Sequence, residues 1–471
     1  MFGSDERQTR SPRQSCHLRI RFNVRLGSFR GVISRVRLMS QKLTTAAMPL
    51  NKLRAGFTIL AAVLLPAAAL GQTAFTWQQI QERFVARNPT LKAAQLNIDE
   101  SRAAEITAFL RPNPDFNLGA DGFQVSRNDG IWRPLSGVVE TPSISYLHER
   151  QHKRELRRDQ AKQSTSISES TYLDQERGLV FNLRNAFVQT LQAKAVLQNA
   201  KENLAYWDRE LDVNRTRLKA GDIAQVDMDR LELQRVQFES DFESAMVNLR
   251  TAKIQLLMLL NDRTPIEQFD VVGPFDFSEG LRRLEEFRSM ALEARPDLKV
   301  ASQNVELAKI TYKLAVANGS TDPTFSVWYS HNSSFANPFA NQTMGGSIDI
   351  PLRIFDRNQG EKARTKIDIG LNERLRDAAE ALVFNDVDSA YWTLIQAGNL
   401  LRPYKARYLK LASDTRDRIA FSYQNGGSSL LDYLDAEKAD RDTRLAYLNL
   451  IGSYLTAAAQ MNMAVGREVL Q

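Results

Sequence analysis

The stretch FESDFESAMVNLRTAKIQLLML, residues 238–259, decides the fold class of this 471-residue chain. Its apolar residues recur at alternating spacings of four and three, at Phe238, Phe242, Ala245, Leu249, Ala252, Leu256 and Leu259. A repeat of about 3.5 residues is typical of helices that supercoil left-handedly against neighbouring helices. The same spacing returns within 197–211 and 445–458. The sequence therefore predicts a mainly α-helical fold of long, antiparallel, coiled helices.

The distribution of proline supports long helices. No proline occurs between Pro142 and Pro265, within 352–402 or within 404–471. A proline inside a helix costs about 3 kcal/mol or more, so its absence permits helices of unusual length. At 1.5 Å per residue, a straight helix over 361–424 would run roughly 90 Å, which no compact globule needs.

Four short segments between the helical blocks have a different pattern. They alternate apolar and polar residues, as strands do, at 115–123, 138–146, 324–330 and 346–350. A tilted membrane-spanning strand needs about 9–11 residues, which these segments approximately supply. Four strands cannot close a barrel, and an open edge in lipid would leave amide groups unsatisfied. If the strands span a membrane, several protomers must combine them.

The chain also contains an internal repeat. The segment NPTLKAA at 88–94 matches RPDLKVA at 295–301, an offset of 207. Farther on, Gly221, Asp227 and Glu232 match Gly426, Asp432 and Glu437 at an offset of 205. We therefore expect a first structural repeat over 72–265, then a linker (265–280) and a second repeat within 266–471. Each repeat should contain a helix, two strands and a long helical hairpin that turns at Gly221 or Gly426.

The N-terminal region has the form of an export signal. Residues 48–54 are basic, 57–65 are apolar, and Ala69-Leu70-Gly71 offers small residues before a cleavage at Gln72, so 48–71 is predicted to be a signal peptide. Residues 1–47 form a basic extension ahead of it, which suggests that the true start is Met48. The only cysteine, Cys16, lies in this extension, so we expect neither a disulfide nor a lipidated cysteine in the mature chain.

Charge argues against a nucleic-acid partner. The chain carries a net charge of +7, but residues 1–47 alone hold ten basic and two acidic residues, and 48–71 adds Lys52 and Arg54. The remaining 72–471 is mildly acidic, so the basicity belongs to the leader and not to a binding surface.

One motif suggests an enzyme. His148-Glu149-Arg150-Gln151-His152 fits H-E-x-x-H, the helical zinc-protease motif. The interpretation is rejected because a solvated basic run follows and no third ligand is indicated. The repeat also aligns Glu149-Arg150 with Asp356-Arg357, which predicts a strand-to-helix turn. Since no P-loop, dinucleotide motif or hydrolase elbow occurs either, we expect no catalysis, no metal and no cofactor.

Three further strings carry a resemblance to a known family: Arg87-Asn88-Pro89-x-Leu91, Arg111-Pro112-Asn113-Pro114 and PLRIFDRNQG at 351–360. With the duplication, they make the chain similar to TolC-like outer-membrane efflux proteins, within them to the CzcC-like heavy-metal export branch. The resemblance implies a homotrimer whose chains each give four strands to a twelve-stranded outer-membrane barrel that continues into a periplasmic α-barrel. It implies a periplasmic adaptor (membrane fusion) protein and an inner-membrane RND-type pump as partners. It also assigns a strand-to-helix junction to Pro351, Asp356, Arg357, Asn358 and Gly360.

The second hairpin carries two aspartates, Asp432 and Asp435, that allow two interpretations. Ser429 and Asp432 fit a helix capping box, and acids near a helix N-terminus complement its dipole. The resemblance instead implies aspartate rings at the periplasmic aperture, which would favour cations. Both can hold together. Tyr423, beside the turn residues Gly426 and Gly427, is a candidate gate residue that also allows two interpretations: it either serves packing or forms a gate hydrogen bond.

Two functions from different classes follow. The first is a passive exit duct in a tripartite efflux system, with heavy-metal cations as the cargo that the branch suggests. The second is a periplasmic coiled-coil structural or adaptor protein that never enters a membrane. The duplicated strand pairs favour the first, because a pure coiled coil does not need them.

Overall fold

The computed structural model describes residues 73–277, 280–332 and 341–470. The chain divides into two units, Met1–Ala67 and Ala68–Gln471, and every described residue lies in the second. The predicted extension (1–47) and signal peptide (48–71) lie outside the described residues, so both stay predictions.

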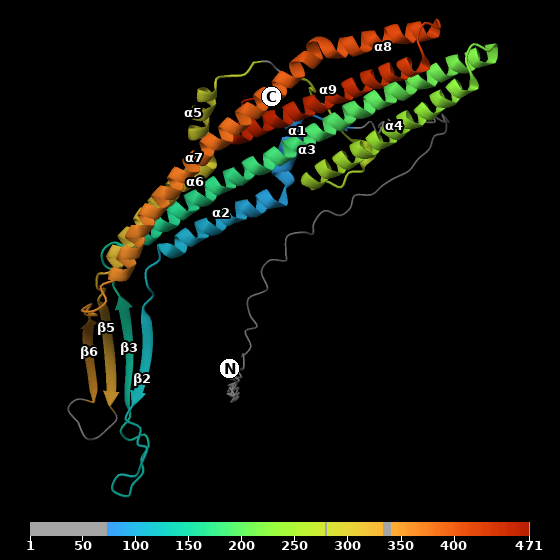
Figure 1. The fold of residues 1–471 in the computed structure, drawn as a ribbon. Coiled ribbons are helices and arrows are strands. Elements are labelled where there is room, and N and C mark those ends of the chain that lie inside the picture. The colour runs from blue at the N-terminus through green and yellow to red at the C-terminus, as the bar shows by residue number, and fades with distance from the viewer. Residues whose placement is uncertain (1–72, 278–279, 333–340, 471) are drawn as a thin grey trace, which may run out of the picture. The chain divides into compact units, whose positions relative to one another are not determined.

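The two halves of the described unit share one plan of helices and strands. The first half holds α1 (Trp77–Arg87), α2 (Pro89–Ala108), α3 (Lys153–Ala220) and α4 (Gln225–Leu259). The second holds α5 (Leu284–Ala294), α6 (Pro296–Asn318), α7 (Gln359–Pro403), α8 (Leu409–Gln424) and α9 (Leu430–Val465). A pair of strands separates the second and third helices of each half (Figure 1).

The NPTLKAA motif marks a helix start. Asn88 ends α1 and caps α2, since its side-chain oxygen accepts hydrogen bonds from the amides of Thr90 (2.9 Å) and Leu91 (3.1 Å). Pro89 occupies the first helical position, where its missing N–H is not needed. The sequence repeat thus corresponds to a break between two helices, where a single helix was expected.

The predicted long helices are confirmed. The 68 residues of α3 correspond to roughly 100 Å. The expected straight helix over 361–424 is interrupted: α7 ends at Pro403, and a five-residue π-helical segment, Tyr404–Tyr408, precedes α8. Proline removes a backbone donor and crowds the preceding turn, so the helix continues only with altered winding.

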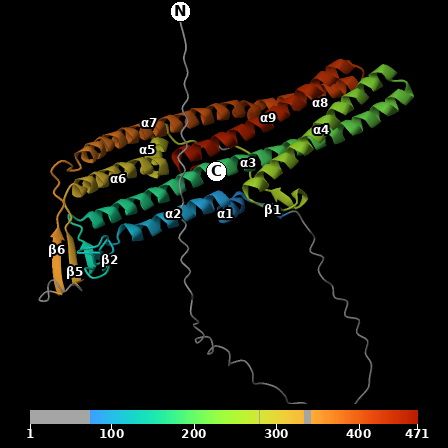
Figure 2. The ribbon, with the colours of Figure 1, turned by 90° about the horizontal axis from the view of Figure 1, so that it is seen from below.

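The long helices lie side by side. Near the strands, α2, α3, α6 and α7 are neighbours in that order (Figure 2). Toward the hairpin turns the order becomes α4, α3, α9 and α8 (Figure 1). The first-half hairpin (α3 and α4) and the second-half hairpin (α8 and α9) therefore meet along α3 and α9.

The four predicted strands are confirmed and form one antiparallel sheet in the order β2, β3, β5, β6. Their bounds are β2 (Asp115–Asp121), β3 (Val139–Leu147), β5 (Thr324–Asn332) and β6 (Gln342–Asp349). Among the described residues, β2 and β6 each have one neighbour, so both outer edges of the sheet are open.

The two faces of this sheet differ in polarity. Cross-strand partners share a face, and Phe116 pairs with Ile144, which pairs with Val327. One register position along, Asn117 pairs with Ser143. The apolar face is exposed: Phe116 keeps 69% of its surface accessible. The sheet therefore presents one apolar and one polar face.

A second, smaller sheet was not expected. β1 (Thr73–Phe75) pairs in parallel with β4 (Phe269–Val271), which lies inside the predicted linker. Lys253 donates to the Phe269 carbonyl oxygen (2.6 Å) and forms an ion pair with Asp270 (3.3 Å). Three-residue strands are too short to show an alternating pattern, so no periodic signal indicated them.

Three apolar clusters hold the helices together. The first joins α3, α5, α7 and α9, and the second joins α1, α2, α3, α4 and β4. The third, which we name the tip cluster, lies near the hairpin turns and consists of Trp207, Leu211, Met228, Leu231, Phe238, Tyr423, Leu430 and Tyr433. Among the described helices, none is both long and apolar enough to cross a bilayer.

Candidate functional site at the hairpin turns and strand ends

Glycines form the two hairpin turns. Gly221 follows α3 with φ +85°, and Gly426 follows α8 with φ +76°. This left-handed conformation favours glycine because a side chain would clash with the backbone. Gly427 lies beside Ser422. A Cβ atom added at Gly427 would lie 2.9 Å from the Ser422 hydroxyl oxygen, so a larger residue there would require Ser422 to shift. The candidate turn residues therefore lie where the two long hairpins reverse direction.

The expected cap at the start of α9 is present. The Asp432 amide donates to the Ser429 hydroxyl oxygen (3.2 Å), and the Ser429 amide donates to the Asp432 carboxylate (3.1 Å). Hydrogen bonds from the Ser429 hydroxyl and amide hold the pKa of the Asp432 carboxyl below its usual range. Asp432 and Asp435 are both exposed on the protomer. The cap therefore leaves both carboxylates open to the surroundings.

Tyr423 packs between the two hairpins. Its ring stacks on Tyr433, with centroids 5.2 Å apart and planes 1° apart, and the Arg217 guanidinium of α3 lies 5.3 Å from its centroid. Within the described residues its buried hydroxyl has no hydrogen-bond partner, and burial raises its pKa. The packing interpretation therefore has direct geometric support in the protomer, and a gate hydrogen bond would need a partner from elsewhere.

A buried charge cluster that the sequence did not reveal lies one turn farther along α9. Asp440 accepts hydrogen bonds from Arg416 of α8 and from Arg444, each at 2.9 Å. Glu437 is only 6% exposed, and its nearest cation is Arg416, at 3.9 Å. Burial raises the pKa of the Glu437 carboxyl to about 7, although Arg416 opposes the shift.

This cluster lines a cavity of about 400 Å³ between α3, α8 and α9. Tyr206 of α3 faces it, with the Arg416 guanidinium 5.4 Å from its ring centroid. Burial raises the Tyr206 pKa as well. The only signal in the sequence was that Glu437 matches Glu232 in the repeat, which says nothing of burial.

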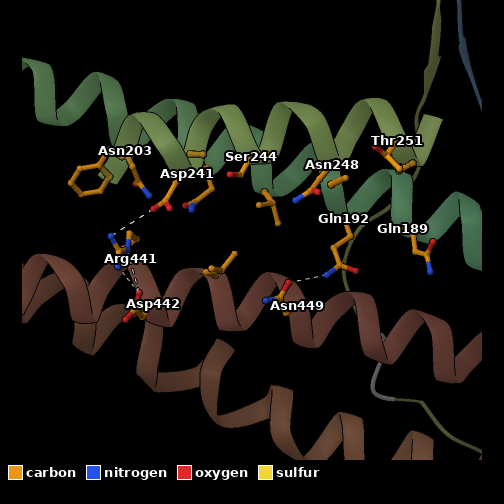
Figure 3. A pocket seen from close by; sticks show the side chains of 18 of the residues that line it. Gln189, Gln192, Asn203, Asp241, Ser244, Asn248, Thr251, Arg441, Asp442 and Asn449 are labelled. Carbon is orange, nitrogen blue, oxygen red and sulfur yellow. Dashed lines mark hydrogen bonds and ion pairs between the residues drawn. The ribbon is translucent and has the colours of Figure 1, made fainter. Parts of the chain in front are cut away.

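A polar seam continues from this cavity between the two hairpins (Figure 3). It encloses about 560 Å³ between α3, α4 and α9. Gln192 donates to Asn449 across it (2.9 Å), and Arg441 approaches Asp241 at 3.7 Å. Its other polar lining residues include Gln189, Asn203, Ser244, Asn248 and Thr251. The hairpins thus meet through amides here and through apolar side chains at the tip cluster.

The predicted junction residues lie between β6 and α7. Asn358 precedes α7 with φ +60°; its amide donates to Asp356 (2.8 Å), and its side chain donates to the Ala315 carbonyl oxygen (2.7 Å). Pro351 and Arg357 precede it, and Gly360 lies in the first turn of α7. The string PLRIFDRNQG therefore forms the predicted strand-to-helix junction.

The H-E-x-x-H motif lies at the matching place of the first half. His152 precedes α3 with φ +57°, and His148 comes before the helix, so the two rings do not share a helical face. Glu149 pairs with Arg157. The described residues contain no group of three or more His, Cys, Asp or Glu side chains placed to hold a metal ion.

Comparison with known proteins identifies the class. The family model described as outer membrane efflux protein matches residues 81–262 and 287–467, more than half of the chain. The chain belongs to this family, and it is an outer-membrane efflux channel that reaches into the periplasm. The family consists of channel proteins.

Individual relatives are distant but cover most of the chain. The cobalt-zinc-cadmium resistance protein CzcC of Cupriavidus metallidurans is 23% identical over 81% of this chain and 87% of its own. The outer membrane protein TolC of Escherichia coli is 21% identical over 82% and 81%. Among solved structures, CusC matches with a TM-score of 0.69 at 19% identity, covering 83% and 92%. The open state of MtrE from Neisseria gonorrhoeae matches at 0.67 and 18%, covering 83% and 89%.

Proposed function

We propose that three copies of this chain form a passive exit duct of a tripartite efflux system. The observation that carries the proposal is the four-stranded sheet, which has one exposed apolar face and two open edges in the described residues. Pairing the β2 edge of one copy with the β6 edge of the next would satisfy both edges and close a twelve-stranded barrel. The apolar face would then meet lipid and the polar face the lumen.

The helical part would continue the duct through the periplasm toward an adaptor protein and an inner-membrane RND-type pump. A passive duct has no chemistry of its own, so partner contacts must favour a wider arrangement of the second-half hairpins. The polar seam supports this role, because its amides can exchange protein hydrogen bonds for water at small net cost.

The narrow end of the duct would lie at the hairpin turns. Three copies would place six carboxylates there, from Asp432 and Asp435, with Tyr423 fixing the hairpin behind them. Like charges around a narrow opening attract cations and repel one another, so the opening would respond to any change of radius. The exposure of both side chains is compatible with this role.

Heavy-metal cations are the proposed cargo. The support from similarity is that one relative, CzcC, is a cobalt-zinc-cadmium resistance protein. The support from structure is the exposed aspartate pair at the turn, because a carboxylate ring favours divalent cations over anions.

The proposal is tested on the native complex. Mature protein should fractionate with outer membranes, run in detergent as a homotrimer and give cation-selective conductance in planar bilayers. Co-purification should recover an adaptor and a pump. A periplasmic monomer that stays in solution without detergent and gives no conductance would overturn the proposal of an exit duct. It would favour the periplasmic coiled-coil alternative, which does not account for the exposed apolar face of the sheet.

A further inference from the structure

The four connections between strands and helices meet at one end of the sheet. Asp115, at the start of β2, pairs with Ser145 of β3; Leu147, at the end of β3, pairs with Thr324, which pairs with Asp349 of β6. The strand ends nearest the helices therefore coincide, as Figure 1 shows. Residues in the connections 109–114, 148–152, 319–323 and 350–358 consequently lie just beyond the same end of the sheet.

Large apolar side chains in these connections are exposed. Phe355 is 90% exposed and Leu352 is 78% exposed, although both belong to the ordered junction before α7. Leu110, in the connection before β2, is 60% exposed. Apolar surface costs about 25 cal/mol per Å² in water, so a group of such side chains marks an interaction surface.

Arginines are interspersed with these apolar side chains. Lys153 and Arg157, which follow β3, are paired with Asp322 and Glu149. By contrast, no ion pair to a carboxylate in the described part of the chain involves Arg111, Arg150 or Arg357, and all three are exposed. The connections thus combine exposed apolar groups with guanidinium groups that pair with no carboxylate of the described protomer, although Asp356 beside Arg357 is exposed as well. We name this set the junction collar: Leu110, Arg111, Arg150, Leu352, Phe355 and Arg357.

We infer that the junction collar binds phospholipids of the periplasmic leaflet of the outer membrane, with its guanidinium groups on the lipid phosphodiesters and its apolar side chains at the acyl boundary. The inference rests on the proposed function, which places the sheet in the bilayer and the helices in the periplasm. Guanidinium groups bind phosphate oxygens in a bidentate manner, and each basic residue near an anionic surface strengthens attachment.

Continuity with the sheet favours lipid over a second copy of the chain as the occupant. β6 ends at Asp349, and the exposed Leu352 and Phe355 follow it in the same connection, so exposed apolar surface continues from the sheet into the junction. The apolar face of this sheet is the face proposed to meet lipid. Apolar side chains beside cationic ones suit the boundary between acyl chains and headgroups.

The test uses full-length protein purified in detergent and measures lipid retention by native mass spectrometry. The probes are palmitoyl-oleoyl phosphatidylglycerol and phosphatidylcholine, which share acyl chains. The variant Arg111→Gln/Arg150→Gln/Arg357→Gln removes the collar charges. The matched control Arg250→Gln/Arg407→Gln/Arg418→Gln removes three exposed arginines from α4, the π segment and α8.

We expect the unaltered protein to prefer phosphatidylglycerol, the collar variant to bind it about ten-fold or more weakly, and the control to bind it normally. Equal binding of phosphatidylglycerol by the collar variant and the unaltered protein, or equal binding of the two probe lipids by the unaltered protein, would overturn the inference.

A second measurement places the apolar part of the collar. In vesicles, Phe355→Trp should add tryptophan fluorescence that brominated lipid quenches, relative to the unaltered protein in the same vesicles. Added fluorescence that brominated lipid leaves unchanged would mean that another subunit covers this position, which would also overturn the inference.

Conductance and trimer mass are recorded on the same samples. Conducting trimers without lipid discrimination would refute the collar and leave the duct intact. A chain that forms no conducting trimer would refute the proposed function itself.

Discussion

The two helical hairpins start from one plan and differ in where they keep their charges. In the first-half hairpin, Glu232 keeps 53% of its side chain exposed and lies 3.4 Å from Arg215. Its repeat partner in the second-half hairpin, Glu437, keeps only 8% and sits in the cavity with Arg416. The same residue type at the same repeat position is thus solvated in one hairpin and buried in the other.

The turns of the two hairpins also differ in how their acidic side chains are paired. Asp227 is followed three residues later by Arg230, at 3.8 Å, so the first hairpin neutralises its acid. Asp432 is followed three residues later by Asp435, so the second hairpin exposes two acids. The second hairpin also follows the π-helical segment, whereas α3 runs unbroken. The second hairpin therefore differs from the first in three ways: it exposes two acids at its turn, buries a carboxylate in a cavity and follows an interrupted helix.

The largest effect should come from separating the hairpins at the tip cluster. Trp207 is fully buried, its ring centroid lies 5.1 Å from Phe238 and 6.1 Å from Tyr433, and its indole N–H donates to the Leu231 carbonyl oxygen. Trp207→Ala should lower the free energy of unfolding by about 3–5 kcal/mol. Chemical denaturation measures it, with the exposed Trp392→Ala as control. Equal losses in both variants would contradict the role of this cluster.

The buried carboxylate predicts a pH effect confined to the second hairpin. The pKa of Glu437 in the folded protein, about 7, exceeds its ordinary value of 4.5, so the folded state binds the proton more tightly than the unfolded state does. Stability should therefore fall as pH rises from about 4.5 to 7, by about 3 kcal/mol at most.

Glu437→Gln should remove this slope, while Glu232→Gln at the matching position should keep it. Unfolding free energies between pH 4 and 8 measure both variants. A slope that survives Glu437→Gln would show that another group is responsible.

A smaller effect on stability, but a distinct one on conduction, is expected at the turn acids. Asp432→Ala/Asp435→Ala should lower cation selectivity and weaken block by divalent cations in planar bilayers. Folding should change little, because loss of a cap is a minor loss in a fold of this size. Asp227→Ala in the first hairpin should leave conduction unchanged. A clear stability loss with unaltered selectivity would mean that the pair serves only the helix start.

The smallest effect is expected at the strand-to-helix turns. His152 and Asn358 precede α3 and α7 with nearly the same φ, +57° and +60°, so asparagine should replace His152 without strain. His148→Ala/His152→Asn should leave conductance unchanged, and the purified protein should lack stoichiometric zinc. One bound zinc per chain, measured by atomic absorption, would revive the protease interpretation.

The parts of this fold that repeat along the chain could be predicted from the sequence. Heptad spacing around Phe238 predicted the hairpins, and the alternation around Phe325 predicted the strands, because both patterns extend over several turns or residue pairs. Ser429 and Asp432 predicted the cap through spacing alone. The burial of Glu437 escaped prediction because it depends on Tyr206 and Arg416, which approach from other helices. The β1–β4 pair escaped because three residues carry no periodic signal.

The polar seam has a consequence for how such chains can diverge. Its side chains, such as Gln192 and Asn449, exchange one amide hydrogen bond across about 560 Å³ of cavity. A hydrogen bond of this kind contributes only about 1 kcal/mol net, and water can take the place of either partner. Substitutions there should therefore be nearly neutral as long as they stay polar. Homologues of this chain should therefore differ most in sequence along the middle of the hairpins, while Trp207 and Tyr433 stay the same. Such variation would let the surface of the hairpins adapt to new partners without a change of fold.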